Sequence, residues 1–363
     1  LDPVKLHPEN TVRLQFESGR LHDRLGNSAE AMRCFACGNA MQADSPAGRS
    51  CSPADYVDRV RRMSDLVSAL PPSTWRPQAA EYARPAPVFL VGFPRSGTTL
   101  LQRMLQAHPS TRVMEEKPAL QAVERALAAM PEGYPAAIDR LDGAAITQLR
   151  RRYFEAAEAW LEPGARGLVI DKMPLNIVNL PLIQRVFPDA QVIVALRHPC
   201  DVVLSNYMQQ YRLNNAMANF GDLASSARLY RRVMSLWLRC STLLPMHVHN
   251  IRYEALLADP EEELRALLTF LGLEWNPEVL AFHRPESQST AVDTPSYEQV
   301  TRPLYRTAAG RWQRYREFLE PCLAQLVPVA DDLGYELEAT EETRIPVSHS
   351  SADQENEDKQ ARQ

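Results

Sequence analysis

The sequence predicts an α/β fold: a P-loop-like parallel sheet flanked by helices, with a short helical segment ahead of it. From Val88 onward, short apolar runs alternate with amphipathic stretches at the spacing of strands and crossover helices. The apolar run 88–91 leads directly into a glycine-bounded loop and then a helical pattern, which is the layout of a phosphate-binding loop. Residues 9–43 instead show two helical patterns.

Composition excludes several classes of function. The 363-residue chain has 45% hydrophobic and 23% charged residues, as ordinary soluble globular proteins do. Its net charge of −5 argues against a general nucleic-acid binder or a binder of anionic membranes. No window approaches the ~18 consecutive apolar residues of a membrane helix. Leu1-Asp2-Pro3 carries no signal-peptide pattern, so we expect a cytoplasmic protein. Residue 1 is not Met, so this expectation allows for further sequence upstream.

Residues 1–45 form the first predicted unit, a hairpin of two amphipathic helices within 9–43 that turns at Gly26-Asn27. The spacing of six residues resembles one tetratricopeptide repeat: Gly19, His22, Leu25, Gly26, Ala31 and Phe35. We expect Leu25 and Phe35 to fill the interface between the helices. A single repeat cannot bury both of its faces, so the hairpin should dock on the next domain or cap further repeats upstream. An arbitrary helical hairpin is the alternative.

A linker with one helix, residues 46–85, precedes the main domain, residues 86–338. Ala43–Pro53 is rich in Ser, Pro and Gly, a helix is expected over Ala54–Leu70, and Pro71-Pro72 ends it. Strands are expected at Val88–Val91, Leu168–Asp171, Gln191–Leu196 and His247–Arg252. Helices are expected after the loop, around Pro118–Leu161, and over Leu175–Phe187, Asp201–Tyr211, Asp222–Leu244 and Pro260–Leu271. The polar residues 339–363 are expected to form a disordered tail.

The loop Gly92-Phe93-Pro94-Arg95-Ser96-Gly97-Thr98-Thr99 is the most informative motif. It fits the spacing G-x-x-x-x-G-K-[ST] except that Thr98 stands where the lysine belongs. That lysine serves β- and γ-phosphates, so its replacement indicates a nucleotide with one 5′-phosphate. We expect Arg95, Ser96, Gly97, Thr98 and Thr99 to form the phosphate site: Gly97 allows close backbone approach, the threonines offer hydroxyls, and Arg95 brings a charge.

A second anion site is predicted at the end of the strand Gln191–Leu196. Arg197 ends that strand, and Ser205 lies on the helix that follows. In open parallel sheets, ligands bind beyond the carboxyl ends of the strands, where both motifs fall. Arg197 and Ser205 can therefore hold a second anion close to the first.

Taken in order, these motifs resemble the sulfotransferases that use 3′-phosphoadenosine 5′-phosphosulfate (PAPS). The resemblance rests on Phe93-Pro94-Arg95-Ser96-Gly97-Thr98-Thr99, His108-Pro109, Arg197-x-Pro199-x-Asp201-x-x-x-Ser205, Arg252-Tyr253-Glu254, the stretch 294–305 and Gly310-Arg311-Trp312. It runs from about Val88 to Leu326. A repeat-like segment ahead of it is similar to bacterial tetratricopeptide-linked members, and the protein-tyrosine sulfotransferases are the most similar characterised relatives.

The resemblance implies roles for individual residues. Arg95 and Lys172 would flank the transferring sulfuryl group and stabilise charge on the leaving phosphate. Glu116 would be the general base; charge alone does not decide between Glu115 and Glu116, and the family spacing from Arg95 selects Glu116. The 3′-phosphate would contact Arg197 and Ser205, and the nucleotide would contact Tyr253, Ser296 and Arg302. The donor carries two separated anions and needs no metal.

The residues also allow plainer interpretations. One alternative is that Lys172 faces solvent and pairs with Asp171. Another is that Glu115 and Glu116 form an acidic pair on the surface without a catalytic role. Cys34-x-x-Cys37 is interpreted as two small helix residues rather than a metal or redox site, because no second pair stands at zinc-like spacing. The scattered cysteines favour a reducing compartment.

Our interpretation is a sulfotransferase that moves a sulfuryl group from PAPS to a hydroxyl in a protein or peptide tyrosine, a carbohydrate or a small molecule. The repeat-like segment favours a macromolecular or peptide acceptor and a protein contact. The alternatives are an ATP-dependent P-loop kinase, opposed by the missing loop lysine, and a non-catalytic nucleotide-binding scaffold. No nucleic-acid or membrane partner is expected, and the oligomeric state stays open.

Overall fold

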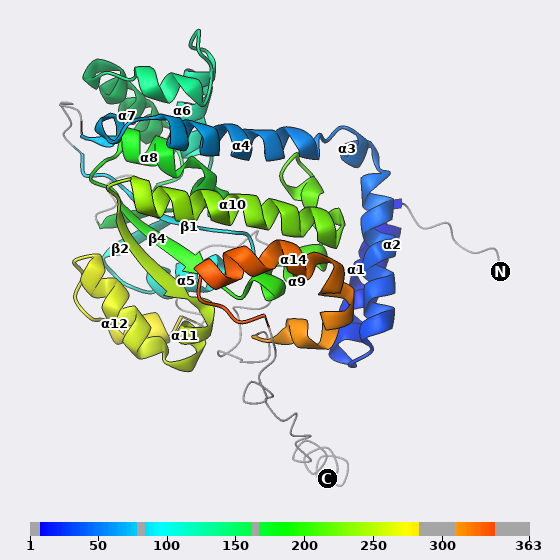
Figure 1. Cartoon of the computed structure of the whole chain (residues 1–363). Coiled ribbons are helices and arrows are strands. Elements are labelled where there is room, and N and C mark those ends of the chain that lie inside the picture. The colour runs from blue at the N-terminus through cyan, green and yellow to red at the C-terminus, as the bar shows by residue number, and fades with distance from the viewer. Residues whose placement is uncertain (1–7, 78–83, 162–166, 283–308, 338–363) are drawn as a thin grey trace.

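The computed structural model describes residues 8–77, 84–161, 167–282 and 309–337. Its centre is a five-stranded sheet in the order β2-β3-β1-β4-β5 (Figure 1). The strands are β1 Val88–Gly92, β2 Thr111–Glu115, β3 Leu168–Lys172, β4 Gln191–Leu196 and β5 His247–Arg252. Every neighbouring pair is parallel, so the carboxyl ends of all five strands meet at one edge. The predicted parallel sheet is confirmed.

Side chains alternate along the central strand and divide the core into two layers. In β1, Phe89 and Val91 belong to the larger core, whereas Val88 and Leu90 belong to the smaller one. Successive side chains of a strand point to opposite faces, and a parallel sheet buried on both faces needs apolar residues at every position. All five residues of β1 are buried, which explains the continuous apolar run.

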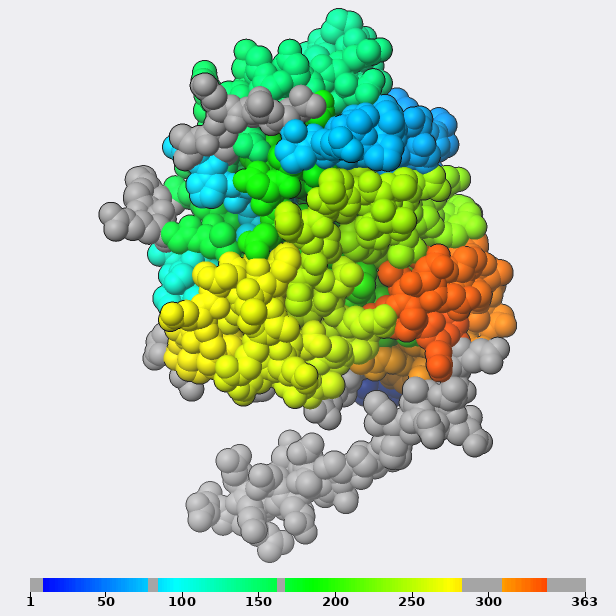
Figure 2. Space-filling view, turned by 60° about the vertical axis from the view of Figure 1, so that its left-hand side comes forward, coloured from blue at the N-terminus to red at the C-terminus, as the bar shows by residue number. Residues whose placement is uncertain are grey.

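Helices cover both faces of the sheet (Figure 1). The larger core lies under α4 Pro53–Ala69, α6 Ala119–Ala128, α7 Gly143–Glu158, α8 Leu180–Val186, α9 Pro199–Tyr207, α10 Leu223–Leu243 and α14 Arg316–Asp332. The smaller core lies under α5 Thr98–Gln106, α11 Tyr253–Ala258 and α12 Pro260–Phe270. Figure 2 shows the yellow surface of α11 and α12 and the orange surface of α14 on either side of the yellow-green α10.

Short 3₁₀ turns complete the described chain: η1 Pro72–Trp75, η2 Ala136–Arg140, η3 Pro174–Asn179, η4 Met217–Gly221, η5 Pro277–Leu280 and η8 Arg311–Tyr315. At η2 and η3 the structure differs from the expected helices. The stretch 118–161 is divided into α6, η2 and α7, and the expected helix Leu175–Phe187 is divided into η3 and α8. Pro181 stands at the start of α8, where a proline fits because that backbone N–H has no helical partner.

The sequence analysis did not predict β2 or α11. β2 is an edge strand with only Thr111 and Met114 buried, so no apolar run marks it. α11 begins directly after β5 and has six residues, too few for a helical period to stand out.

The N-terminal hairpin consists of α1 Pro8–Arg24 and α2 Ser28–Ala43, as predicted. Phe16 and Phe35 pack with ring centroids 6.0 Å apart, and a Cβ on Gly19 would lie 2.7 Å from the Phe35 ring, so Gly19 lets the helices approach. The expectation for Leu25 was wrong: its side chain is 72% exposed, because it lies at the turn beyond the helix contact.

The hairpin docks on the main domain rather than standing apart. Val12, Phe16 and Phe35 belong to the same core as the larger face of the sheet. The Asn39 amide donates to the Tyr207 carbonyl at 3.0 Å, and the carboxylate of Asp23 accepts from the Tyr315 hydroxyl at 2.6 Å. One of the two outcomes predicted for a lone repeat, docking on the next domain, is therefore what the structure shows.

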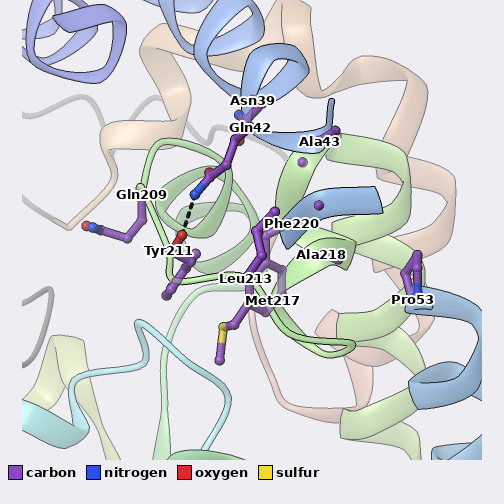
Figure 3. Close-up of a pocket in the computed structure, with 12 residues that line it drawn as sticks. Asn39, Gln42, Ala43, Pro53, Gln209, Tyr211, Leu213, Met217, Ala218 and Phe220 are labelled. Atoms are coloured by element: carbon purple, nitrogen blue, oxygen red, sulfur yellow. Dashed lines mark hydrogen bonds between the residues drawn. The ribbon is translucent and has the colours of Figure 1, made fainter. Parts of the chain in front are cut away.

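The expected linker holds one further turn of helix, α3 Pro46–Arg49, whose N-cap Ser45 accepts from the Gly48 amide at 3.0 Å. A cavity of about 130 Å³ lies between α2, α3 and the segment 209–221. In Figure 3, Gln42 extends from α2 to the Tyr211 carbonyl across this cavity. Among the residues that the structure describes, no helix has both the length and the apolar character needed to cross a bilayer.

Candidate active site at the carboxyl edge of the sheet

The loop after β1 turns sharply into α5 through a left-handed glycine. Gly97 is the N-cap of α5 with φ of +100°, a conformation that glycine adopts without strain. A Cβ at this position would also lie 2.8 Å from the Tyr253 ring. Both constraints require glycine, and they leave the backbone N–H groups of the first turn of α5 directed beyond the sheet edge.

The polar residues of the loop have different positions: Ser96 stabilises the turn, and Thr98 and Thr99 begin α5. The Ser96 hydroxyl and backbone N–H both donate to the Phe93 carbonyl, at 2.7 and 3.1 Å, so this side chain fixes the turn. Thr98 and Thr99 are buried at the start of α5. A helix start of this kind attracts an anion through its N–H groups and its dipole.

The two predicted anion motifs meet at Arg95. Its Nε donates to Ser205 Oγ on α9 at 3.1 Å, and Arg197 Nη1 donates to the Arg95 carbonyl at 3.2 Å. The guanidinium of Arg197 stacks on Tyr253, 4.5 Å from the ring centroid. The structure thus brings together four residues that the sequence predicted from three separate motifs.

Positive charge is concentrated around Arg95. Burial lowers the pKa of the Arg95 guanidinium, the nearby ring of Tyr211 opposes this, and the charges of Arg197, Arg311 and Arg20 lower it further. Like charges gathered in a partly buried site disfavour each other, and a bound anion relieves this repulsion. The residues present therefore fit a ligand that carries negative charge.

Lys172 and the acidic pair form the second half of the site. The Lys172 side chain is completely buried, and its Nζ lies 2.6 Å from Glu116 Oε1 and 3.7 Å from Glu115 Oε1. Asp171 points to the other face of the sheet, where it accepts from the Tyr153 hydroxyl at 2.8 Å. The alternative of a solvent-facing lysine paired with Asp171 is wrong.

Tyr211 connects the two halves. Burial raises the pKa of Tyr211, the charge of Arg95 lowers it and the charge of Glu116 raises it, so charges from both halves of the site act on this group. Its hydroxyl donates to Asn206 Oδ1 at 2.7 Å, and the Asn206 amide donates to the Pro94 carbonyl of the loop at 2.9 Å. Tyr211 also lines the cavity of Figure 3.

Sequence reasoning missed Tyr211, Arg311 and Arg20. Arg311 stands in the motif Gly310-Arg311-Trp312, which was a usable signal. Arg20 lies on α1, pairs with Glu17 at 2.7 Å and influences Arg95 through its charge; no local pattern reveals an influence that depends on the docking of the hairpin. Ser296, Arg302 and the tail 339–363 lie outside the described residues.

No group of three or more His, Cys, Asp or Glu side chains suited to a metal ion occurs in the described ranges 8–77, 84–161, 167–282 and 309–337. The Cys34 thiol is buried and the Cys37 thiol is exposed; Cys37 Sγ lies 3.9 Å from Met41 Sδ. His198 stacks on Trp312 with ring centroids 4.9 Å apart.

Residues 87–277, more than half of the chain, match the family described as "Sulfotransferase family". An uncharacterised protein of Aquifex aeolicus (strain VF5) is 30% identical over 248 residues, 65% of this chain and 32% of the relative; the chain thus spans about a third of that relative. Protein-tyrosine sulfotransferase 1 of Danio rerio is 27% identical over 266 residues, 66% of this chain and 71% of the relative.

Among solved structures, the sulfotransferase domain from the curacin biosynthetic pathway aligns with a TM-score of 0.50 and 20% identity, over 71% of this chain and all of that domain. This likeness concerns the fold. The family match contains Arg95, Glu116, Lys172, Arg197 and Ser205, so all five stand in the part of the chain that carries the similarity.

Proposed function

The chain belongs to the sulfotransferase family, and we propose that it transfers a sulfuryl group from PAPS to a hydroxyl acceptor. The observation that carries the proposal is the contact of Arg95 with both Ser205 and Arg197. A donor with a phosphosulfate at one end and a 3′-phosphate at the other needs two anion sites side by side, and a kinase for nucleoside triphosphates does not.

The residues present fit this donor. The 5′-phosphosulfate would lie against the loop 92–97 and the N-terminus of α5, held by backbone N–H groups, Thr98 and Thr99. The 3′-phosphate would lie at Arg197 and Ser205, where the guanidinium is already ordered by its stacking on Tyr253. The charges of Arg197 and Arg311 act on Arg95, although each also lies near a carboxylate, Asp201 at 3.9 Å and Asp23 at 3.4 Å; this gathering of guanidinium groups supports an anionic ligand at this position.

The chemistry assigns one role to each group. Glu116 accepts the proton of the acceptor hydroxyl while that oxygen forms a bond to sulfur. The bond from sulfur to the 5′-phosphate oxygen breaks, and its electron pair stays on the phosphate. Lys172 and Arg95 stabilise the charge that develops there, as expected for a transfer governed by positioning and electrostatics. The products are the sulfated acceptor and adenosine 3′,5′-bisphosphate.

Glu116 is better placed than Glu115 to be the base. Its side chain is 37% exposed, against 18% for Glu115, and it makes the shorter contact with Lys172. A base must reach a substrate hydroxyl within hydrogen-bond distance. Exposure thus supports the residue that the family spacing selects.

We propose a protein or peptide tyrosine as the first acceptor class to test, ahead of glycans and small phenols. Several relatives carry the name protein-tyrosine sulfotransferase, including those of Danio rerio and Gallus gallus. The docked hairpin adds surface next to Tyr211, which supports an acceptor larger than a small molecule. The six cysteines are free thiols, which supports a reducing compartment such as the cytoplasm.

An acceptor screen with ³⁵S-labelled PAPS tests the proposal. Tyrosine peptides, glycans and phenols are offered in parallel, with Mg²⁺ chelated. We expect label in at least one acceptor class and release of adenosine 3′,5′-bisphosphate. Absence of transfer to every class, together with Mg²⁺-dependent phosphate transfer from ATP, would establish a kinase instead.

A further inference from the structure

Glu115 and Lys172 are lateral neighbours at the end of two adjacent strands. They are register partners in the parallel pair of β2 and β3, so their side chains leave the sheet on the same face. The ladder extends one residue beyond the strands, since the Glu116 N–H donates to the Lys172 carbonyl at 2.8 Å. Glu115 therefore faces Lys172 as a direct consequence of strand pairing.

Glu116 reaches the same ammonium only because the backbone turns. In a continuing strand, consecutive side chains point to opposite faces, which would direct Glu116 away from Lys172. Its φ is instead +48°, a left-handed conformation that is rare for a residue with a Cβ. Among the described residues, Arg95 with φ of +71° is the other non-glycine with positive φ. Both lie at the proposed site, where such strain is commonly kept for function.

The buried Lys172 ammonium therefore has two neighbouring carboxylates at different distances. Glu116 makes the short contact of 2.6 Å, and Glu115 stays at 3.7 Å. Glu115 Oε1 is buried and accepts no hydrogen bond within the described part of the chain. A buried carboxylate oxygen without a donor is costly unless it is needed at another stage.

The proposed transfer supplies that stage. When Glu116 accepts the acceptor proton, it becomes neutral and loses its attraction for Lys172. A buried ammonium left without a counter-ion would be strongly disfavoured. Glu115, which does not exchange protons with the substrate, would then be the remaining negative group beside Lys172.

We propose that Glu115 is a positioning residue for Lys172: it holds the ammonium at the sheet edge while Glu116 turns to the acceptor hydroxyl. This inference rests on the proposed function. It assigns the adjacent carboxylates different tasks, one in proton transfer and one in keeping the cation beside the leaving phosphate oxygen. Glu115 touches neither the acceptor nor the donor in this scheme.

The kinetic test compares Glu115→Gln and Glu115→Asp with the unchanged protein, using labelled PAPS and the acceptor found in the screen. We expect Glu115→Gln to lower kcat on the order of 10- to 100-fold through misplacement of Lys172, with KM for the donor nearly unchanged. Glu115→Asp, which keeps the charge, should recover part of the loss. Unchanged kcat in Glu115→Gln, or no recovery in Glu115→Asp, would overturn the proposal.

A spectroscopic test needs no acceptor. The chain has only four lysines, at 5, 117, 172 and 359, so ¹⁵N-lysine labelling yields few Nζ signals, and Lys172→Met assigns one of them. A buried, ion-paired ammonium exchanges slowly with water and stays visible. We expect the Lys172 signal to persist in Glu116→Gln, where Glu115 takes over, and to vanish when both glutamates are replaced by Gln.

Loss of the signal in Glu116→Gln alone would contradict the proposal. Glu124→Gln is the matched control. Glu124 lies on α6, is 13% exposed and pairs with Arg59 of α4 at 2.9 Å, so replacing it should leave both kcat and the Lys172 signal unchanged. If the unchanged protein transfers no sulfuryl group, the proposed function fails, while the lysine signal still decides whether Glu115 holds Lys172.

Discussion

Arg95 donates from Nε to Ser205 Oγ at 3.1 Å, across 110 residues of sequence. Together with the hydrogen bond from Arg197 Nη1 to the Arg95 carbonyl, this contact joins the two motifs. The loop after β1 and the helix after β4 belong to neighbouring strands of a parallel sheet, so their ends meet at one edge. The contact places the two proposed anion sites next to each other at the carboxyl edge of the sheet.

Replacing Arg197 should affect ligands with a 3′-phosphate more than ligands without one. We expect Arg197→Ala to weaken binding of adenosine 3′,5′-bisphosphate far more than binding of adenosine 5′-monophosphate, because Arg197 would contact the 3′-phosphate only. Calorimetric titration of both ligands measures the difference. Arg252→Ala is the control, since Arg252 stacks on Tyr335 at 4.6 Å outside the site. Equal losses for both ligands would show that Arg197 does not bind the 3′-phosphate.

Removing the Lys172 ammonium should impair the transfer step and spare the fold. Lys172→Ala is expected to lower turnover on the order of 10²–10³-fold, the typical cost of losing one group that stabilises developing charge. Lys172→Met, closer in shape, should give the same loss. Lys117→Ala serves as control, because Lys117 lies at 4.6 Å over the Trp160 ring and has no assigned role. Near-normal turnover of the Lys172 variants would remove this residue from the mechanism.

Asp171 should make the stability of the protein depend on pH. Burial raises the pKa of Asp171 to about 7 from 3.8, against the opposing effect of the Tyr153 hydrogen bond. Between pH 4 and 7 the folded protein then binds more protons at this group than the unfolded chain does, so the free energy of unfolding falls as pH rises. The gap of about three pKa units corresponds to a change on the order of 4 kcal/mol.

Asp171→Asn tests this, because an amide oxygen still accepts from Tyr153 and does not titrate. In urea unfolding, we compare the free energy of unfolding of the variant with that of the unchanged protein. The difference, variant minus unchanged protein, should increase from pH 4 to pH 7 and stay constant above pH 7. Asp65→Asn, at an exposed position paired with Arg61, should show no such trend. A difference that stays constant between pH 4 and 7 would mean that Asp171 ionises normally in the folded protein.

Asp23 should be the main polar anchor of the hairpin. Its carboxylate accepts from Tyr315 at 2.6 Å and Arg314 at 3.1 Å, and its side chain is only 13% exposed. We expect Asp23→Asn to reduce the free energy of unfolding by about 1–2 kcal/mol and to speed hydrogen exchange in α1 and α2. Glu30→Gln, in an exposed pair with Arg33, should leave both unchanged. Unaltered exchange in Asp23→Asn would show that the apolar contacts alone fix the hairpin.

The sequence predicted those parts of the fold that local patterns encode. Apolar runs marked β1, β3 and β4, the three inner strands of the sheet, since strands covered on both faces favour apolar residues, and the loop residues followed from the demands of an anion site. β5 was also predicted, although it is an edge strand in which only Ile251 is buried. β2 was not predicted, because only Thr111 and Met114 are buried in it and no apolar run marks it, and Glu115 was therefore not recognised as the register partner of Lys172. Tyr211 and Arg20 influence Arg95 through tertiary packing, which no local sequence pattern encodes.

Calorimetric titration of the purified chain with adenosine 3′,5′-bisphosphate, with divalent metals chelated, measures whether the protein binds the product of a PAPS-dependent transfer. We expect saturable binding at one site per chain, which is lost when Arg197 and Ser205 are both replaced by Ala. No binding of the bisphosphate by the folded protein, or binding of ATP only when Mg²⁺ is present, would contradict this expectation.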